Sequence, residues 1–350
     1  MISNIAPKHQ HGGQLQKAAK AYNIPLLDWL DLSTGINPNV YPLPAVPEKI
    51  WQRLPESDDG LDKVASGFYG SDYLLAVAGS QEAIQNLPKI FPKKLQIGII
   101  KPAYHSHHQA WEKAGHQLIE ISSNEVDKNI NLLDVLIVVN PTNPSTEQFS
   151  TQTLLNWHQQ LQQQNATLIV DEAFMDATPE QSLITKVPKK GLIVLRSIGK
   201  FFGLAGIRLG FVWAEAALLK QLGKQQDDWS VSHPARWAGK LALADNDWQQ
   251  QQRLQLPQES QRLVKLLEDL VFTKPLLTGG VYFNTTNEHV FNTPLFAYFE
   301  HPRAKVIHQQ LAQQGILTRL FSQPPALRFG LPTNEPAWQT LAQGLDSLKL

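Results

Sequence analysis

The chain has 350 residues, with 31 basic and 31 acidic side chains and no cysteine. Balanced charge argues against bulk attraction to nucleic acid or to an anionic membrane, although a local basic pocket remains possible. The lack of cysteine excludes disulfides, thiolate zinc sites and cysteine nucleophiles. Residues 1–22 lack the apolar core of a signal peptide, and no run of 18 apolar residues occurs, so we expect a cytoplasmic protein with no membrane partner.

From about residue 70, short apolar runs alternate with helix-like stretches. The apolar runs predict strands at 73–78, 95–100, 135–140, 167–172, 191–197 and 207–213. Each run is continuous rather than alternating, which is typical of strands buried on both faces. Helices are predicted between them at 81–91 and 150–164. This alternation of strand and helix predicts an α/β fold with a mostly parallel, doubly wound sheet.

After about residue 225 the pattern changes to that of a smaller α+β domain. A long helical pattern precedes short strands at 279–285 and 294–300, a helix at 303–314, a strand at 326–332 and a last helix at 334–348. We therefore predict three segments. An N-terminal arm, 1–36, belongs to the small domain; a large domain covers 37–225; and a small C-terminal domain covers 226–350.

Polar residues follow the predicted strands at the sheet edge where ligands of open α/β folds bind. Taken one at a time, each has an ordinary reading as a helix cap, a turn residue, a core residue or a solvated side chain. In chain order these residues are Ser80 and Gln81, Tyr104, Asn143, Asp171, Ser197, Lys200 and Arg208.

Taken together, the same residues match one particular ligand. Ser80 at a helix N-terminus, with Ser197 and Arg208, would form an anion cradle suited to a phosphate. Asp171 at a buried strand end can keep a pyridine nitrogen protonated. A nearby amide can donate to a phenolate, a tyrosine ring can stack on a flat heterocycle, and Lys200 can form an imine with an aldehyde. These groups describe pyridoxal phosphate.

The order of the motifs strengthens this interpretation. "NPTNPS" (140–145), "VDEAF" (170–174), "SIGKFFGLAGIRLGF" (197–211) and "LRFGLP" (327–332) resemble the signatures of pyridoxal-phosphate enzymes of the aspartate-aminotransferase fold, fold type I. The resemblance implies the three-layer form of the sheet and covalent attachment of the cofactor to Lys200. It implies that Asp171 contacts the pyridine nitrogen, Asn143 the phenolate and Tyr104 the ring. It assigns the phosphate to Ser80, Gln81, Ser197 and Arg208.

Narrower motifs indicate a branch of that family. "HGG" (11–13), "LDLSTGINP" (30–38), "RLPESDDGL" (53–61) and "WSVSHPA" (229–235) resemble the threonine-phosphate decarboxylases of cobalamin biosynthesis. The resemblance implies decarboxylation of O-phospho-L-threonine to (R)-1-amino-2-propanol phosphate by a homodimer. The related histidinol-phosphate aminotransferases, or another class I/II aminotransferase, remain the alternative.

The same resemblance implies substrate contacts. Arg328 falls where the family binds the substrate carboxylate, and Arg319 where histidinol-phosphate enzymes bind the substrate phosphate. Which of the two arginines takes which anionic group stays open. Asn37 and His11 are further candidates, His11 being the weaker because an N-terminal arm can simply order on the surface.

Three positions depart from the family pattern. Phe174 stands where many aminotransferases have a tyrosine hydroxyl near the phenolate, and Gly199 replaces a serine or threonine beside the lysine. Leu54 stands where related enzymes have a tyrosine that reaches the partner subunit's cofactor phosphate. Gly199 and Leu54 thus remove two hydroxyls that could bind the cofactor phosphate. Each lost hydrogen bond should weaken phosphate binding by about 1 kcal/mol.

Other interpretations explain fewer residues. A non-catalytic relative would be expected to lose Lys200 or Asp171, and both are present. A nicotinamide-dependent dehydrogenase is poorly supported because "AVAGSQEA" (76–83) has one glycine where GxGxxG needs three. His105, His107 and His108 have no neighbouring carboxylate pair, so we interpret them as surface or pocket histidines and predict no metal site.

Overall fold

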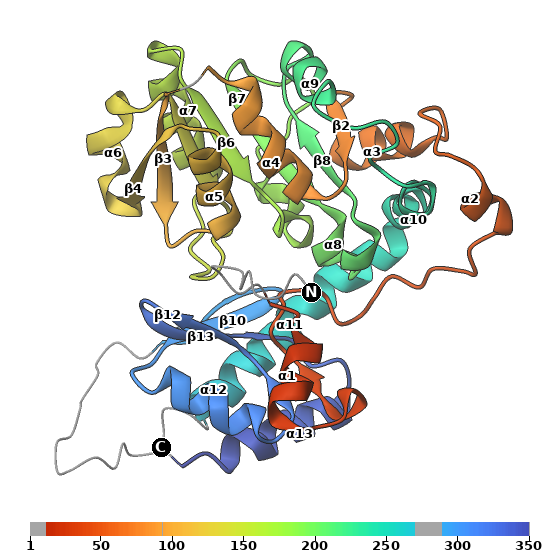
Figure 1. The fold of residues 1–350 in the computed structure, drawn as a ribbon, viewed down its shortest axis with the longest axis vertical. Coiled ribbons are helices and arrows are strands. Elements are labelled where there is room, and N and C mark those ends of the chain that lie inside the picture. The colour runs from red at the N-terminus through yellow and green to blue at the C-terminus, as the bar shows by residue number, and fades with distance from the viewer. Residues whose placement is uncertain (1–11, 93, 270–288, 350) are drawn as a thin grey trace, which may run out of the picture. The chain divides into compact units, whose positions relative to one another are not determined.

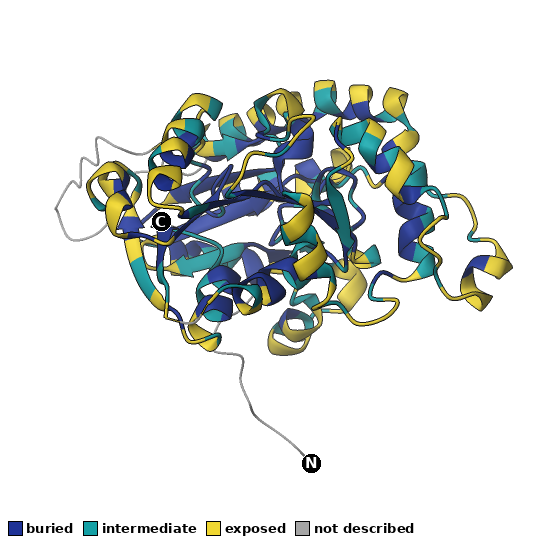
Figure 2. Ribbon diagram, turned by 90° about the horizontal axis from the view of Figure 1, so that it is seen from above, coloured by how far each residue is buried: buried dark blue, intermediate teal, exposed yellow. Residues whose placement is uncertain are grey.

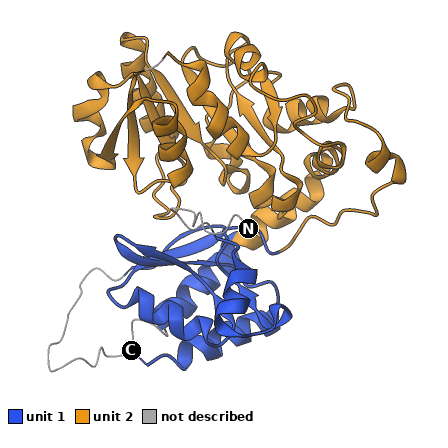
Figure 3. Ribbon diagram, in the orientation of Figure 1, with its two compact units in different colours: residues 1–38, 257–350 blue, residues 39–256 orange. Residues whose placement is uncertain are grey.

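The computed structural model describes residues 12–92, 94–269 and 289–349. The chain divides into two compact units (Figure 3). Residues 1–38 and 257–350 form the small unit, and residues 39–256 form the large unit. The predicted strand at 279–285 and the candidate residue His11 lie outside the described residues.

A seven-stranded sheet forms the centre of the large unit (Figure 1). Its order is β2-β8-β7-β6-β5-β3-β4, and all neighbours are parallel except that β8 is antiparallel to both β2 and β7. The strands are β2 (Leu74–Val77), β3 (Gln96–Lys101), β4 (Gln117–Ser122), β5 (Val135–Val139), β6 (Thr167–Asp171), β7 (Leu192–Ser197) and β8 (Gly210–Trp213).

The predicted fold class is confirmed, and the large sheet has one strand more than was predicted. β4 pairs with β3 at the edge of the sheet and was not predicted. Its sequence, QLIEIS, mixes exposed and half-buried residues and therefore lacks the continuous apolar run of the central strands. The predicted strand at 207–213 starts later, at Gly210, because the short 3-10 helix η6 (Ala205–Ile207) and Arg208 in left-handed backbone precede it.

Helices cover both faces of the large sheet, which makes three layers. Side chains of α4 and α5 pack with Ile137 and Ile169 on one face, and side chains of α6 and α7 pack with Val138 and Val170 on the other. Successive residues of β5 and β6 thus enter opposite cores, which explains their continuous apolar sequence. Figure 2 shows the buried strands between layers of helix whose outer surfaces are exposed.

The helices have the following bounds. In the large unit they are α2 (Glu48–Gln52), α3 (Leu61–Tyr69), α4 (Ser80–Ile90), α5 (His105–Lys113), α6 (Val126–Asn129), α7 (Thr151–Gln163), α8 (Ile198–Phe201), α9 (Ala216–Gly223) and α10 (His233–Ala244). The helix α11 (Asn246–Leu267) has its first residues in the large unit and its last residues in the small unit. The small unit also contains α1 (Leu15–Tyr22), α12 (Ala304–Ala312) and α13 (Glu335–Asp346). Side-chain caps begin three of them, since Ser150, Ser232 and Asn334 each accept a backbone N–H of the first turn.

The small unit contains an antiparallel sheet of order β12-β13-β10-β9. Its strands are β9 (Phe291–Thr293), β10 (Phe296–Glu300), β12 (Arg319–Ser322) and β13 (Pro325–Gly330). A second, two-stranded sheet pairs β1 (Leu30–Asp31) with β11 (Ile316–Leu317) in parallel. This pairing joins the segment before residue 38 to the C-terminal part of the chain.

The compact units differ from the predicted boundary at residue 225. Residues 226–256 belong to the large unit because α10 packs against α3 and Arg236 forms a two-bonded ion pair with Asp59. At the start of α11 the ring of Trp248 stacks on that of Phe202, with centroids 5.6 Å apart. No helix within the described ranges has the length and hydropathy needed to cross a bilayer.

Candidate active site

Most of the predicted cofactor residues gather at one edge of the large sheet. Asp171 and Ser197 are the last residues of the parallel strands β6 and β7, which are neighbours. Because β8 runs antiparallel to β7, its first residue, Gly210, lies at the same edge, in register with Ser197. The loop holding Asn143 follows β5, whose residue Val139 is in register with Asp171.

Close approach of backbone builds an anion cradle at this edge. A Cβ placed on Gly210 would lie 2.8 Å from the backbone nitrogen of Ser80, so β8 contacts the first turn of α4 directly. A Cβ on Gly79, which has φ +75°, would lie 2.7 Å from Nη2 of Arg208. These contacts bring the N-terminus of α4, Ser197 and the Arg208 guanidinium together, an arrangement whose charge and N–H donors would suit an anion.

The Asp171 carboxylate is buried and held from two sides. Its side chain is 3% exposed, and Oδ1 accepts the backbone N–H of Ala173 at 3.1 Å. Its Oδ2 lies 2.9 Å from Nε2 of His107, which is 1% exposed and projects from α5. A carboxylate oriented in this way can hold the protonated nitrogen of a pyridine ring.

His107 contacts the candidate site and was not predicted to do so from the sequence. We interpreted it as one of three ordinary histidines, and only the fold shows that it contacts Asp171 across 64 positions of sequence. The available signal was its spacing of three from Tyr104 at the start of a helix, which favours one side of that helix. The rings of Tyr104 and His107 do meet edge to face, with centroids 6.4 Å apart.

Tyr104, Gln81 and Lys200, also predicted from the sequence to contact the cofactor, make contacts of their own. The hydroxyl of Tyr104 donates to Oε1 of Gln81 at 3.2 Å, which links α5 to the first turn of α4. The Nζ atom of Lys200, in α8, lies 5.4 Å from the centroid of the Phe174 ring. Phe174 thus faces the lysine directly.

The structure gives a steric reason for Gly199. A Cβ at this position would lie 2.9 Å from Cα of Ala205 in η6, which is closer than side chains approach backbone. The serine or threonine found beside the lysine in relatives therefore does not fit this loop.

The predicted substrate residues Asn37, Arg319 and Arg328 belong to the small unit. Arg319 of β12 and Arg328 of β13 are directly opposite each other, so both side chains start from one face of the sheet. Two guanidinium groups that start from one face of a sheet are of the kind that binds anionic groups. Nη2 of Arg328 also donates to the carbonyl of Ser33 at 2.8 Å, and Asn37 is 1% exposed.

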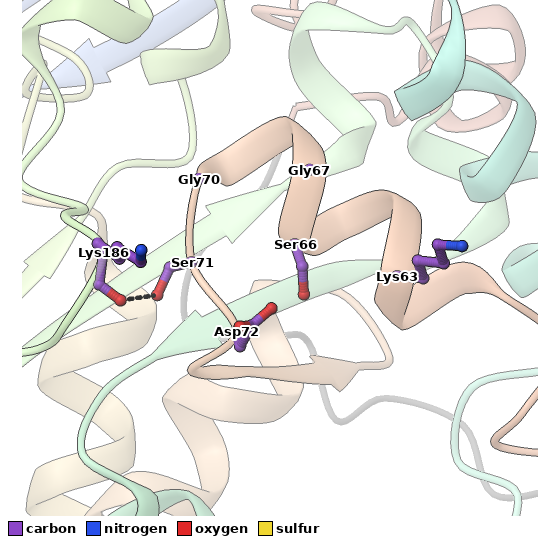
Figure 4. A pocket seen from close by; sticks show the side chains of 7 residues that line it. All are labelled: Lys63, Ser66, Gly67, Gly70, Ser71, Asp72 and Lys186. Atoms are coloured by element: carbon purple, nitrogen blue, oxygen red, sulfur yellow. Dashed lines mark hydrogen bonds between the residues drawn. The ribbon is translucent and has the colours of Figure 1, made fainter.

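A separate hollow of about 500 Å³ lies at the end of α3 (Figure 4). It is lined by Lys63, Ser66, Gly67, Gly70, Ser71, Asp72 and Lys186, none of which is a predicted site residue. The hydroxyl of Ser71 donates to the Lys186 carbonyl at 3.1 Å, so this side chain joins the end of α3 to a loop 115 positions away in the sequence. Across the described residues, no cluster of three or more histidines and acids could hold a metal ion.

Comparison with known proteins decides the family. Residues 61–339 match the model of the aminotransferases of class I and II. The chain belongs to this family. The family prediction made from the motifs is thereby confirmed.

Two relatives align with nearly the whole length of this chain. A threonine-phosphate decarboxylase of Pseudomonas aeruginosa is 47% identical over 97% of this chain and 98% of its own. A second threonine-phosphate decarboxylase, from Sinorhizobium sp, is 35% identical over the same shares. Among solved structures, the histidinol-phosphate aminotransferase of Sinorhizobium meliloti in complex with pyridoxal-5'-phosphate has a TM-score of 0.78 at 16% identity, covering 99% of this chain and 97% of its own.

Proposed function

We propose that the protein catalyses the pyridoxal-phosphate-dependent decarboxylation of O-phospho-L-threonine to (R)-1-amino-2-propanol phosphate, a step of cobalamin biosynthesis. The observation that carries this proposal is the 47% identity over 97% of the chain to a threonine-phosphate decarboxylase. The site supports it because Lys200, Asp171 and the phosphate cradle occupy one edge of one sheet.

The residues present fit the cofactor group by group. The cradle at Ser80, Ser197 and Arg208, with Gly210 leaving room at the N-terminus of α4, suits the phosphate. The buried Asp171 suits the ring nitrogen. When bound, pyridoxal phosphate supplies an electron sink that stabilises negative charge on the substrate's α-carbon.

The chain's own residues decide which bond of the substrate breaks. With the cofactor bound, the orientation in which the protein holds the substrate would decide which bond at the α-carbon breaks. We infer that Arg319 and Arg328 bind the two anionic groups of the substrate, its phosphate and its carboxylate. Their opposition across the β12–β13 pair supports a doubly anionic ligand. Lys200 then carries the proton that replaces the lost carboxylate on the α-carbon.

An aminotransferase acting on histidinol phosphate is the second candidate. It is favoured by the likeness in fold to histidinol-phosphate aminotransferases and by a 26% identical relative, histidinol-phosphate aminotransferase 1 of Psychrobacter arcticus. The higher identity to the decarboxylases over more of the chain favours decarboxylation.

We also propose that the protein is a cytoplasmic homodimer, as the family resemblance implies. The segment around α2 exposes large apolar side chains, among them Val40, Trp51 and Leu54, and α2 stands away from the sheet of its own unit (Figure 1). Burial of these side chains against a second copy would remove apolar surface from water. Light scattering coupled to size exclusion tests this, and a monomeric mass for the holoenzyme would contradict it.

The activity is tested by incubating the holoenzyme with O-phospho-L-threonine and no keto acid, while carbon dioxide and aminopropanol phosphate are measured. Release of both over many turnovers, abolished in Lys200→Ala, is the expected result. Amino transfer without carbon dioxide, seen only after a keto acid is added, would instead establish the aminotransferase. Arg319→Ala separates the roles of the arginines, since an enzyme that keeps its preference for phosphorylated substrates would exclude Arg319 as the phosphate ligand.

A further inference from the structure

Three charged residues form a buried cluster on the opposite face of the large sheet from Asp171 and Ser197. We call Glu172, Asp176 and Arg196 the back-face cluster; their side chains are 0%, 1% and 1% exposed. Successive residues of a strand point to opposite faces, so Glu172 points away from the side of Asp171, and Arg196 away from the side of Ser197. The proposed cofactor residues therefore adjoin the cluster in sequence without touching it.

The cluster is held together by charge-assisted hydrogen bonds. Nη1 of Arg196 donates to Oε2 of Glu172 at 2.7 Å, and Nη2 of Arg196 donates to Asp176. The carboxylate of Glu172 also accepts the hydroxyl of Ser182 at 2.6 Å and the backbone N–H of Leu183 at 2.8 Å. Burial raises the pKa of both acids, and the Arg196 charge opposes that rise.

Two further groups complete the surroundings of Arg196. Its guanidinium carbon lies 5.0 Å from the ring centroid of Tyr69, and Nε of Arg253 donates to the backbone carbonyl of Asp176 at 3.1 Å. Two buried acids thus share the buried Arg196, and the half-buried Arg253 lies beside Asp176. Removal of one acid takes away one of the two carboxylates that bind the Arg196 guanidinium in a buried region, which costs more than the loss of an exposed pair.

The cluster lies where it can set the geometry of the site. Glu172 follows Asp171 directly, and Arg196 directly precedes Ser197. The backbone N–H of Glu172 also donates to the carbonyl of Leu195 at 2.9 Å, which extends the β6–β7 pairing to this point. The ion pair between Glu172 and Arg196 therefore fastens the ends of the two strands to each other.

We propose that the back-face cluster is a positioning device for cofactor binding. It holds Asp171 and Ser197 at the separation that lets one molecule of pyridoxal phosphate contact both, through its ring nitrogen and its phosphate. Glu172 and Arg196 are positioning residues, because they act through their neighbours and touch neither cofactor nor substrate. The inference rests on the proposed cofactor and is independent of which reaction follows.

The test compares isosteric variants at two ion pairs of the large unit, the buried Glu172–Arg196 pair and the partly buried Asp59–Arg236 pair. Glu172→Gln removes the negative charge of Glu172 from the cluster and keeps the shape of its side chain. Asp59→Asn does the same to the Asp59–Arg236 pair, whose atoms lie 2.8 and 2.9 Å apart and whose residues are outside the proposed site. Three quantities are measured for each: the melting temperature, the dissociation constant of pyridoxal phosphate from the apoprotein, and the absorbance spectrum of the bound cofactor across pH.

Both variants are expected to lower the melting temperature. Only Glu172→Gln is expected to weaken cofactor binding, by about tenfold or more, and to change the pH dependence of the bound cofactor's spectrum. A Glu172→Gln protein with wild-type cofactor affinity and spectrum, whatever its melting temperature, would overturn the proposal and leave the cluster a part of the core.

A milder variant covers the case in which Glu172→Gln does not fold. Ser182→Ala removes a hydroxyl that donates to Glu172 at 2.6 Å and accepts from Nη1 of Arg196 at 3.2 Å and from the backbone N–H of Ile184 at 3.1 Å. It keeps all three charged side chains of the cluster and is expected to shift the cofactor spectrum in the same direction. An unchanged spectrum and affinity in Ser182→Ala would then count against the positioning role. Failure of the proposed reaction looks different, since wild-type protein would bind the cofactor normally and release no carbon dioxide.

Discussion

Replacement of Gly210 by alanine should damage the phosphate cradle without touching any of its hydrogen-bonding side chains. The new Cβ would lie 2.6 Å from the carbonyl oxygen of Arg196, 2.8 Å from the backbone nitrogen of Ser80 and 3.1 Å from the backbone carbon of Gly79. All three are backbone atoms of β7 and of the start of α4, so no flexible side chain can move aside. The start of β8 must shift away from the N-terminus of α4.

The magnitude follows from these contacts. Carbon atoms rest about 3.5–4.0 Å apart at their optimal separation, so the backbone must move by roughly 0.5–1 Å. Overpacking of this kind costs about 1–3 kcal/mol, which for a unit of this size corresponds to a fall in melting temperature of about 2–12 °C. Loss of one backbone hydrogen bond to the charged phosphate costs about 1.5–3 kcal/mol, hence about 10- to 150-fold weaker cofactor binding.

The assay is a spectrophotometric titration of apoprotein with pyridoxal phosphate, together with thermal unfolding. Gly206→Ala is the matched control: it lies four residues earlier, in η6, and a Cβ there would meet nothing within 4 Å. The control should bind and unfold like the wild type. Gly210→Ala protein that binds the cofactor within twofold of wild type, at an unchanged melting temperature, would refute the close approach as the basis of the cradle.

Three further predictions follow from single contacts. Gly199→Ser, which adds a hydroxyl beside the lysine, should lower the melting temperature and fail to tighten cofactor binding, because its Cβ meets backbone at 2.9 Å; tighter binding would show that the loop yields. His107→Leu should weaken cofactor binding about tenfold, because it removes the imidazole nitrogen that lies 2.9 Å from the buried Asp171 carboxylate. Wild-type affinity in this variant would show that the histidine serves packing alone. Arg262 lowers the pKa of Glu335 through two hydrogen bonds, so this ion pair stabilises the fold at neutral pH and stops doing so as pH falls below about 4.5. The melting temperatures of wild type and Glu335→Gln should therefore differ at pH 7 and converge towards pH 3. A difference that stays constant over this range would contradict the prediction.

Local sequence was enough to predict the centre of the large unit. The strands β5, β6 and β7 are buried on both faces, so their continuous apolar runs carry their own signal. The strand-end positions of Asp171 and Ser197 followed from the same runs. The edge strand β4 was not predicted because its partly exposed sequence lacks a continuous apolar run.

Features that depend on contacts between distant parts of the chain could not be predicted from local sequence patterns. The assignment of residues 226–256 to the large unit rests on α10 packing against α3, far away in sequence. The Arg319–Arg328 opposition depends on the register of two strands, and register shows only when they pair.

The sequence by itself determined the fold class, the family and the residues proposed to hold the cofactor, because each of these is carried by a local pattern or a motif of fixed spacing. Only the tertiary structure decided which side chains surround those residues. The contact of His107 with Asp171 joins α5 to β6, and the ion pair of Glu172 with Arg196 joins the ends of β6 and β7. Buried charges need partners, and partners from separate elements meet only when the chain has packed.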